Sequence, residues 1–160
     1  MPQVFSFIAY SNTGKTTYVE SLIRELKALG LRVGAMKHDA HEFEIDKEGK
    51  DSWRFARAGA DIVAVASATK AAIMEYRPVE FNELLSRMKD VDIIIVEGWH
   101  SEAENKICLW RSDCGKPMKL RPEECVAVVS DVDIEGSSAP VFPLNGPKVL
   151  ADWLYEKIKQ

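Results

Sequence analysis

Residues 7–17 read Phe7-Ile8-Ala9-Tyr10-Ser11-Asn12-Thr13-Gly14-Lys15-Thr16-Thr17. This stretch predicts a buried strand, a tight loop and the first turn of a helix, with the spacing of a phosphate-binding P-loop. Such a loop directs backbone N–H groups at phosphate oxygens, and the helix N-terminus adds partial positive charge there. The first glycine of the general pattern is Ala9 here, which fits if the φ angle of Ala9 is negative.

The P-loop pattern predicts a role for each of its residues. Backbone N–H groups of residues 11–16 are expected to hold phosphates, and Lys15 is expected to reach the β- and γ-phosphates. The Thr16 hydroxyl is the expected Mg²⁺ ligand. The predicted nucleotide-binding residues of the loop are Ser11, Asn12, Thr13, Gly14, Lys15, Thr16 and Thr17. The alternative is a chance Gly-Lys-Thr, which the apolar strand before it and the helix after it disfavour.

Composition restricts the class of protein. With 160 residues, 46% of them hydrophobic, one compact domain over residues 1–160 is expected. A net charge of −4, with both signs dispersed, argues against a nonspecific nucleic-acid binder. The chain has no apolar run long enough for a transmembrane helix, and the start at Met1-Pro2-Gln3-Val4 lacks the basic and apolar pattern of a signal peptide, so neither segment is expected. The three cysteines, Cys108, Cys114 and Cys125, lack C-x-x-C spacing, so a cytoplasmic, reduced protein without a thiolate zinc site is expected.

Strand-like and helix-like segments alternate along the chain. Strands are predicted over residues 3–9, 31–36, 61–67, 70–76, 91–96, 106–111 and 125–129, with 61–67 and 70–76 as a hairpin. Helices are predicted over residues 16–29, from Asp51 to Gly59, after Pro78 and from Pro147 onward. Residues 91–96 are almost wholly apolar, as in the middle of a parallel sheet. The pattern predicts an α/β fold, a P-loop NTPase-like three-layer α/β/α arrangement with a mainly parallel sheet.

Ligands of such sheets bind at the carboxyl ends of the strands. Glu97 ends the apolar strand, where a Walker B carboxylate would lie near Mg²⁺, and Gly98 would let the backbone pass close to a phosphate. Glu97 is therefore predicted as a metal-binding and catalytic residue, and a structural acid at a strand end is the alternative.

The segment Lys37-His38-Asp39-Ala40-His41 follows the second strand and emerges at the same edge. Asp39 is predicted to hold Mg²⁺ or to orient an attacking water, which makes it the second catalytic candidate. His38 and His41 are candidates for a metal, a phosphate or a substrate, but two histidines three residues apart do not make a zinc site without further ligands.

Asp131 follows another apolar strand and is the candidate for base selection. A carboxylate can accept hydrogen bonds from guanine N1–H and its 2-amino group, whereas adenine offers no matching pair of donors. The Asn-Lys-x-Asp signature of many guanine-nucleotide proteins is incomplete, because Asn105-Lys106-Ile107-Cys108 lacks the aspartate.

Five segments resemble the MobB family of molybdopterin-guanine dinucleotide biosynthesis adaptor proteins. They are residues 9–17, 33–41, 43–54, 57–60 and 95–99, with a weaker match at 128–131. The P-loop alone is unspecific, whereas the Lys-His-Asp to Lys-Asp-Ser part is distinctive. The chain departs from the family at position 100, where His100 follows Trp99 and family members often carry lysine.

The resemblance implies a GTP-binding protein with slow GTPase activity and Mg²⁺ as cofactor. It implies a homodimer and a partner, the MobA-type nucleotidyltransferase that attaches GMP to molybdopterin, and molybdopterin itself is a further candidate ligand. Slow hydrolysis is expected because the motif contains no obvious catalytic base or arginine finger, and Arg54 and Arg57 are candidates to act across a dimer.

Two other functions remain open from the sequence. A small-molecule kinase would use the same P-loop, but it needs an acceptor pocket and usually an arginine-rich lid, which the sequence does not show clearly. A GTP-driven metallochaperone would use His38, His41 and Cys114 to handle metal, and the cysteine spacing argues against it.

Overall fold

The computed structural model describes residues 1–38, 43–99 and 101–159. The chain divides into two compact units. The larger comprises Met1–His38 and Leu84–Gln160, and the smaller comprises Asp39–Glu83. Each unit is described here by itself.

The larger unit is built on a six-stranded sheet in which every strand pair is parallel. Its strands are β1 (Gln3–Ile8), β2 (Val33–Lys37), β5 (Ile93–Glu97), β6 (Asn105–Trp110), β7 (Ala127–Ser130) and β8 (Val141–Pro143). Their order is β2-β5-β1-β6-β7-β8, which places β1 between β5 and β6 in the interior of the sheet. The predicted α/β fold with a mainly parallel sheet is confirmed, while β8 was absent from the predicted strands.

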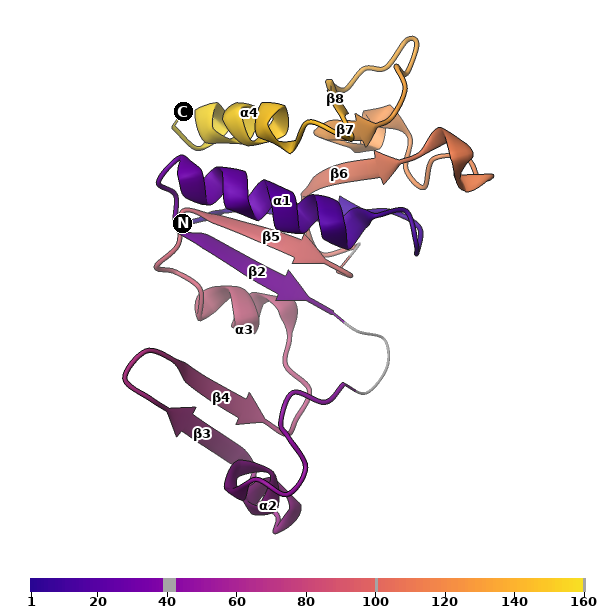
Figure 1. The fold of residues 1–160 in the computed structure, drawn as a ribbon. Helices are drawn as coiled ribbons and strands as arrows, with labels where there is room; N and C mark the ends of the chain where they lie inside the picture. Colours follow the sequence, from indigo (N-terminus) through magenta and orange to yellow (C-terminus); the bar gives the residue numbers. More distant parts are fainter. Residues whose placement is uncertain (39–42, 100, 160) are drawn as a thin grey trace. The chain divides into compact units, whose positions relative to one another are not determined.

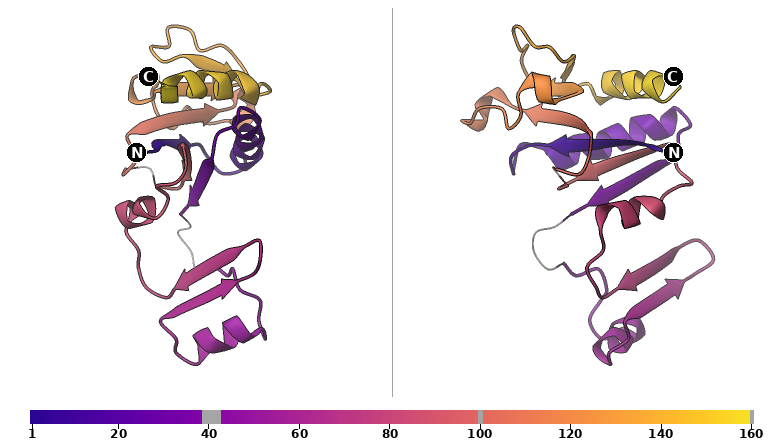
Figure 2. Two further views of the ribbon diagram at one scale, coloured as in Figure 1. Left: turned by 90° about the vertical axis from the view of Figure 1, so that its left-hand side faces the viewer. Right: turned by 180° about the vertical axis from the view of Figure 1, so that it is seen from behind.

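Two long helices cover one face of this sheet. Helix α1 (Lys15–Ala28) and helix α4 (Pro147–Lys159) pack against each other and lie on the same face of the sheet, as Figures 1 and 2 show. Their contact with the sheet is a single apolar cluster that includes Phe7, Leu22 and Leu154, all fully buried. Among the helices of the described residues, none has the length and apolar character that crossing a membrane requires.

The opposite face of the sheet is also buried along its inner strands. Ile94 and Val128 have no exposed surface. The Cε atom of Met88 lies 2.7 Å from the position that a Cβ on Gly34 would take. Strand β2 can therefore lie close to the segment around Met88 because residue 34 is a glycine. Helix α3 (Phe81–Ser86) precedes that segment, and two short 3₁₀ turns (Ser112–Cys114 and Pro122–Glu124) follow β6.

Strand ends differ from the predicted ranges by one or two residues, for local reasons. The predicted strand over 125–129 begins instead at Ala127. The Cys125 N–H donates to the carbonyl of Pro122 at 3.1 Å, so Cys125 closes a 3₁₀ turn and is not available to pair with β6.

The smaller unit contains helix α2 (Asp51–Arg57) and the hairpin of β3 (Ile62–Ala66) and β4 (Ala71–Glu75). The hairpin is antiparallel, as predicted, with Ala64 opposite Ile73. Helix α2 contacts β3, and Val63 is buried. Because side chains alternate along a strand, Ile62 and Ile73 lie on the other face of the hairpin, where both are exposed.

Candidate functional site

The loop between β1 and α1 has the backbone that a phosphate site requires. Asn12 and Gly14 adopt positive φ angles of 64° and 83°, conformations that asparagine and glycine tolerate. The Thr13 hydroxyl donates to the Tyr10 carbonyl at 2.8 Å, a hydrogen bond within the loop that stabilises its conformation. Ala9 is not among the residues with positive φ, so alanine fits at the position of the missing glycine.

The N-terminus of α1 is open toward this loop. Gly14 is the N-cap residue, and neither a capping side chain nor an acidic residue occupies the first turn. The first N–H groups of the helix therefore remain available, and no carboxylate there repels an anion. Of the residues that the P-loop pattern predicted, Ser11, Thr16 and Thr17 have exposed side chains at this end.

Lys15 and Glu97 form an ion pair at the carboxyl edge of the sheet. Lys15 Nζ lies 2.6 Å from Glu97 Oε1, and the two side chains are 14% and 20% exposed. The parallel pairing of β1 and β5, with Phe7 beside Glu97, brings the two residues to the same edge. The structure thus places the predicted Walker B residue, Glu97, beside the lysine that the P-loop pattern predicts to bind phosphate.

The donor set at this edge fits a hard divalent cation. Thr16 offers a hydroxyl oxygen and Glu97 a carboxylate oxygen, the ligand types that Mg²⁺ prefers. Within residues 1–38, 43–99 and 101–159, no group of three or more His, Cys, Asp or Glu side chains could hold a metal by itself. Mg²⁺ is usually held by one or two protein oxygens together with phosphates and waters, so Thr16 and Glu97 could supply its protein ligands.

The loop after β2 meets the loop after β5 through their backbones. The His38 N–H donates to the Glu97 carbonyl at 2.8 Å, and the His38 ring lies 4.8 Å from the Trp99 ring. Gly98 has a φ of 102°, and a Cβ there would come within 2.5 Å of the His38 carbonyl oxygen. The group that approaches Gly98 closely is therefore the backbone of the loop after β2, whereas the sequence suggested a phosphate. The predictions on Asp39, His41 and His100 fall outside the described residues.

Asp131 lies at the end of β7 and binds the segment after β6. Its Oδ1 accepts the Ser112 N–H and its Oδ2 accepts the Ser112 hydroxyl, both at 2.8 Å. Both hydrogen bonds lower the pKa of Asp131 from its ordinary value, and the bond from the Ser112 N–H has the larger effect. The carboxylate thus fastens the β6 and β7 ends to each other, and each oxygen keeps one further lone pair for a ligand.

Three basic side chains lie close to the P-loop, and none of them was identified from the sequence. Arg111 Nη1 lies 3.9 Å from the position of a Cβ on Gly14. Lys119 Nζ lies 3.5 Å from the Ala9 carbonyl oxygen, and Lys116 Nζ is 4.9 Å from the centre of the Tyr10 ring. With Lys15, they bring four cationic groups to the loop, of which Lys15 is paired with Glu97 and Arg111 with Asp113.

A signal existed for one of these three residues. Arg111 directly follows a strand, so the rule that ligands bind at the carboxyl ends of strands would have selected it. Lys116 and Lys119 lie in a long irregular segment, where sequence periodicity gives no information on position.

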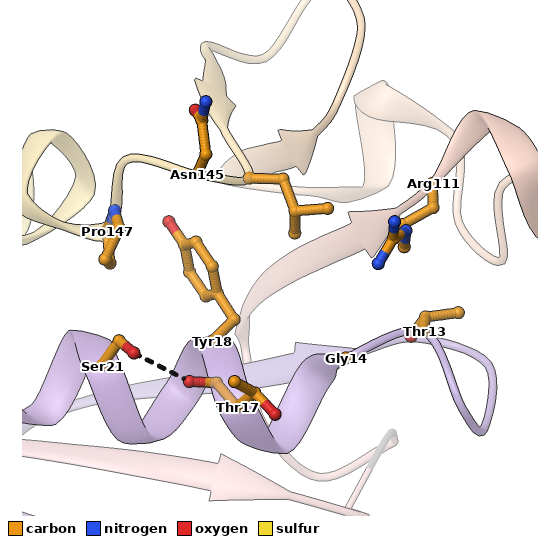
Figure 3. Close-up of a pocket in the computed structure, with 9 residues that line it drawn as sticks. Thr13, Gly14, Thr17, Tyr18, Ser21, Arg111, Asn145 and Pro147 are labelled. Carbon is orange, nitrogen blue, oxygen red and sulfur yellow. Dashed lines mark hydrogen bonds between the residues drawn. The ribbon is translucent and has the colours of Figure 1, made fainter.

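A pocket of about 390 Å³ lies beside the first turns of α1. It is lined by Thr13, Gly14, Thr17, Tyr18, Ser21, Arg111, Leu144, Asn145 and Pro147. Figure 3 shows α1 on one side and the segment that leads from β8 into α4 on the other. Asp131 is not among the lining residues. The pocket continues from the P-loop along the helix, so a ligand held by its phosphates could extend into it.

Arg54 and Arg57 lie on α2 in the smaller unit. Arg54 is within 3.9 Å of Asp51, and the Arg57 guanidinium lies 5.2 Å from the centre of the Trp53 ring. Their action across a dimer stays a prediction.

Comparison with known proteins gives consistent matches. The family model described as molybdopterin guanine dinucleotide synthesis protein B, MobB, matches residues 4–131. The molybdopterin-guanine dinucleotide biosynthesis adapter protein of Escherichia coli (strain K12) is 39% identical over 168 residues, covering 98% of this chain and 93% of that protein. The Haemophilus influenzae protein of the same name is 39% identical over 149 residues, covering 91% and 83%.

A solved structure supports the fold. The crystal structure of a molybdopterin-guanine biosynthesis protein B aligns with a TM-score of 0.74 at 24% identity, covering 98% of this chain and 99% of that one. The family resemblance seen in the sequence segments is confirmed by the family model over residues 4–131 and by the Escherichia coli relative, whose alignment covers 98% of this chain. The chain belongs to the MobB family, the family of molybdopterin guanine dinucleotide synthesis protein B.

Proposed function

We propose that this chain is an adapter in molybdopterin guanine dinucleotide biosynthesis that binds Mg²⁺·GTP at the P-loop and hydrolyses it slowly. The observation that carries the nucleotide part is the Lys15–Glu97 pair of 2.6 Å at the open N-terminus of α1. It combines the lysine, the acid and the free N–H groups of a P-loop nucleotide site at one edge of the sheet.

The phosphates are expected at the loop of residues 11–16. Backbone N–H groups and the helix N-terminus would bind them, with Lys15 leaving Glu97 to contact the β- and γ-phosphates. Arg111 and Lys119 add positive charge beside Gly14 and Ala9. Opposite charges at short range favour an anion here over a neutral ligand.

Thr16 and Glu97 are the residues that would hold Mg²⁺, directly or through its waters. The ion, when bound, neutralises charge on the phosphate oxygens. Glu97 and Asp39 are the proposed catalytic residues, with the role of orienting the attacking water. Slow turnover is expected because Glu97 would be engaged by Mg²⁺ or its waters and the motif contains no obvious catalytic base or arginine finger.

The adapter role comes from the relatives. The Escherichia coli and Haemophilus influenzae proteins are named adapter proteins of molybdopterin-guanine dinucleotide biosynthesis, and the alignment covers most of each. We extend that role to this chain, with a MobA-type nucleotidyltransferase as the protein partner and molybdopterin as a further ligand.

The hairpin of the smaller unit is the proposed dimer surface. Ile62 and Ile73 are 60% and 68% exposed on one face, where Ala64, Ala66 and Ala71 continue an apolar strip that ends at Glu75, which lies opposite Ile62 and pairs with Arg77. A two-stranded sheet is marginally stable by itself, and an exposed apolar strip is a usual mark of an interface. A second copy of this chain would cover the strip with an identical one.

The testing experiment is calorimetric titration of GTP and then ATP into the purified protein with Mg²⁺. A clear preference for GTP supports the proposal. Equal or stronger ATP binding contradicts the guanine part and favours a small-molecule kinase, which rapid ADP formation with a small acceptor would then establish. Stoichiometric binding of a transition metal without nucleotide would favour a metallochaperone.

A further inference from the structure

Cys108 and Cys125 are two free thiols that lie against each other in the larger unit. Cys108 is a residue of β6 with no exposed surface, and Cys125 is a partly exposed residue that ends the 3₁₀ turn before β7. Their side chains form a hydrogen bond with each other, although the two residues are far apart in the chain. Two thiols in contact are the arrangement that disulfide formation requires, because one sulfur must attack the other.

The two thiols differ in acidity and in exposure. The hydrogen bond from the Cys125 thiol is the main reason why the pKa of Cys108 is lowered, and burial opposes it. The backbone N–H groups of Leu120 and Lys119 also donate to the Cys108 sulfur and lower its pKa. Cys125 keeps the shared proton, so this hydrogen bond raises the pKa of Cys125. The pair therefore combines a buried sulfur with thiolate character and a protonated sulfur that solvent reaches.

The segment that donates to the Cys108 sulfur also contacts the P-loop. Strands β1 and β6 pair in parallel with Ile8 beside Cys108, and Ala9 follows Ile8 directly. Lys119 Nζ donates to the Ala9 carbonyl at 3.5 Å, and the N–H of the same residue is one of the donors to the Cys108 sulfur. Lys119 thus connects the thiol pair to the P-loop through a single residue.

We propose that Cys108 and Cys125 are a site of reversible oxidation, at which a low-molecular-weight disulfide such as oxidised glutathione forms a Cys108–Cys125 disulfide and thereby weakens the contact of Lys119 with the P-loop. A disulfide sulfur carries no charge and accepts hydrogen bonds more weakly than a thiolate, so the N–H groups of Lys119 and Leu120 lose a strong acceptor. Cys114, the third cysteine, donates to the Lys116 carbonyl at 3.3 Å and takes no part in the pair.

The oxidation consists of two thiol–disulfide exchange steps. In the first, the exposed Cys125 sulfur attacks one sulfur of the small disulfide and gives its proton to the Cys108 thiolate. The bond of the small disulfide breaks, a thiolate leaves, and a mixed disulfide remains on Cys125. In the second step the Cys108 sulfur attacks Cys125, and its proton goes to the second departing thiol. The pair loses two electrons, which convert the small disulfide into two thiols, and excess thiol reverses both steps.

The first test maps the disulfide in the full chain without nucleotide. Wild-type protein is incubated with oxidised glutathione, its free thiols are alkylated, and its peptides are identified by mass spectrometry. The expected product has a Cys108–Cys125 disulfide with Cys114 alkylated, and dithiothreitol restores all three thiols. Cys114→Ser is the control and should form the same disulfide. A pair that stays reduced, or a glutathione adduct that persists on Cys125, would overturn the proposal.

The second test measures the effect on the P-loop, and this part rests on the proposed nucleotide site. Inorganic tripolyphosphate is titrated into the reduced and the oxidised wild-type protein. The oxidised form should bind about 3- to 10-fold more weakly, because one cationic side chain beside the phosphates loses its position. Lys119→Gln should bind as weakly as the oxidised wild type, and oxidation should weaken it no further. Cys125→Ser, treated with the same oxidant, should keep its affinity.

The outcomes of the two tests are distinguishable. Equal tripolyphosphate affinities of reduced and oxidised wild-type protein would overturn the link between the disulfide and the P-loop. If the reduced wild-type protein binds no tripolyphosphate and no GTP, the proposed nucleotide site fails together with that link, whereas a mapped Cys108–Cys125 disulfide still establishes the oxidation site.

Discussion

Lys15 Nζ and Glu97 Oε1 lie 2.6 Å apart, and this contact joins the P-loop to the end of the inner strand β5. Each partner compensates the other while both are largely removed from water. A bound nucleotide would exchange this contact for two new ones, lysine with phosphate and carboxylate with Mg²⁺ or its waters.

The Glu97→Gln variant distinguishes two roles of Glu97, its ion pair with Lys15 and its proposed contact with Mg²⁺. The variant should need about 10- to 100-fold more Mg²⁺ for GTP binding, because it removes a charged oxygen at the metal. GTP binding in excess EDTA should not weaken, since Lys15 is released from its partner. Calorimetry at a series of Mg²⁺ concentrations measures both effects. Glu104→Gln, an exposed acid before β6, is the control, and an unchanged Mg²⁺ requirement in Glu97→Gln would remove Glu97 from the metal site.

Asp131→Ala tests base selection directly. If Asp131 binds guanine, the variant should lose its preference for GTP over ATP while its affinity for tripolyphosphate stays constant. If Asp131 only fastens β7 to Ser112, the preference survives and the protein merely becomes less stable. Competition binding with the two nucleotides distinguishes these results. Asp133→Ala, an exposed neighbour, should change neither property.

Gly98→Ala should destabilise the protein by about 2–5 kcal/mol, since it adds backbone strain to a clash. The new Cβ would lie 2.5 Å from the His38 carbonyl oxygen, at a φ of 102°. Gly136→Ala is the matched control, with a φ of 70° and no atom within 4 Å, so it should cost only the strain of about 1–2 kcal/mol. Urea unfolding measures both, and equal costs would show that the contact with His38 does not matter.

Ile73→Asp should convert a dimer to a monomer. The side chain is 68% exposed on the apolar strip of the hairpin, where a buried carboxylate without a partner would oppose association. Sedimentation velocity gives the oligomeric state. Val149→Asp, on α4 and 52% exposed, is the control that should leave the dimer intact. A wild-type protein that is monomeric at all concentrations would contradict the proposed interface.

The sequence predicted the central part of the fold because that part follows local rules. The apolar run at 91–96 and the spacing of the P-loop were enough to place β1, α1 and β5. Parallel pairing then brings Glu97 to Lys15 with no further information. The hairpin of β3 and β4 was equally visible, since its strands are rich in β-prone residues and adjacent in the chain.

The remaining features depend on contacts between distant segments. Strand β8 has three residues and ends in Pro143, which is too short for any periodicity. The pocket joins α1 to Leu144 and Pro147, near the far end of the chain. Tyr18 could be read from the sequence only as a residue of α1, and its unpaired hydroxyl becomes visible only once the surrounding segments are placed.

The measurement that tests the central claim most directly is calorimetric titration of Mg²⁺·GTP into the wild-type protein and into Lys15→Ala. Lys148→Ala, an exposed lysine on α4 paired with Asp152, serves as the control. The account predicts saturable binding to wild type and to the control, and no measurable binding to Lys15→Ala at the same concentrations. Undiminished binding by Lys15→Ala would contradict the assignment of the loop at residues 9–16 as the phosphate site.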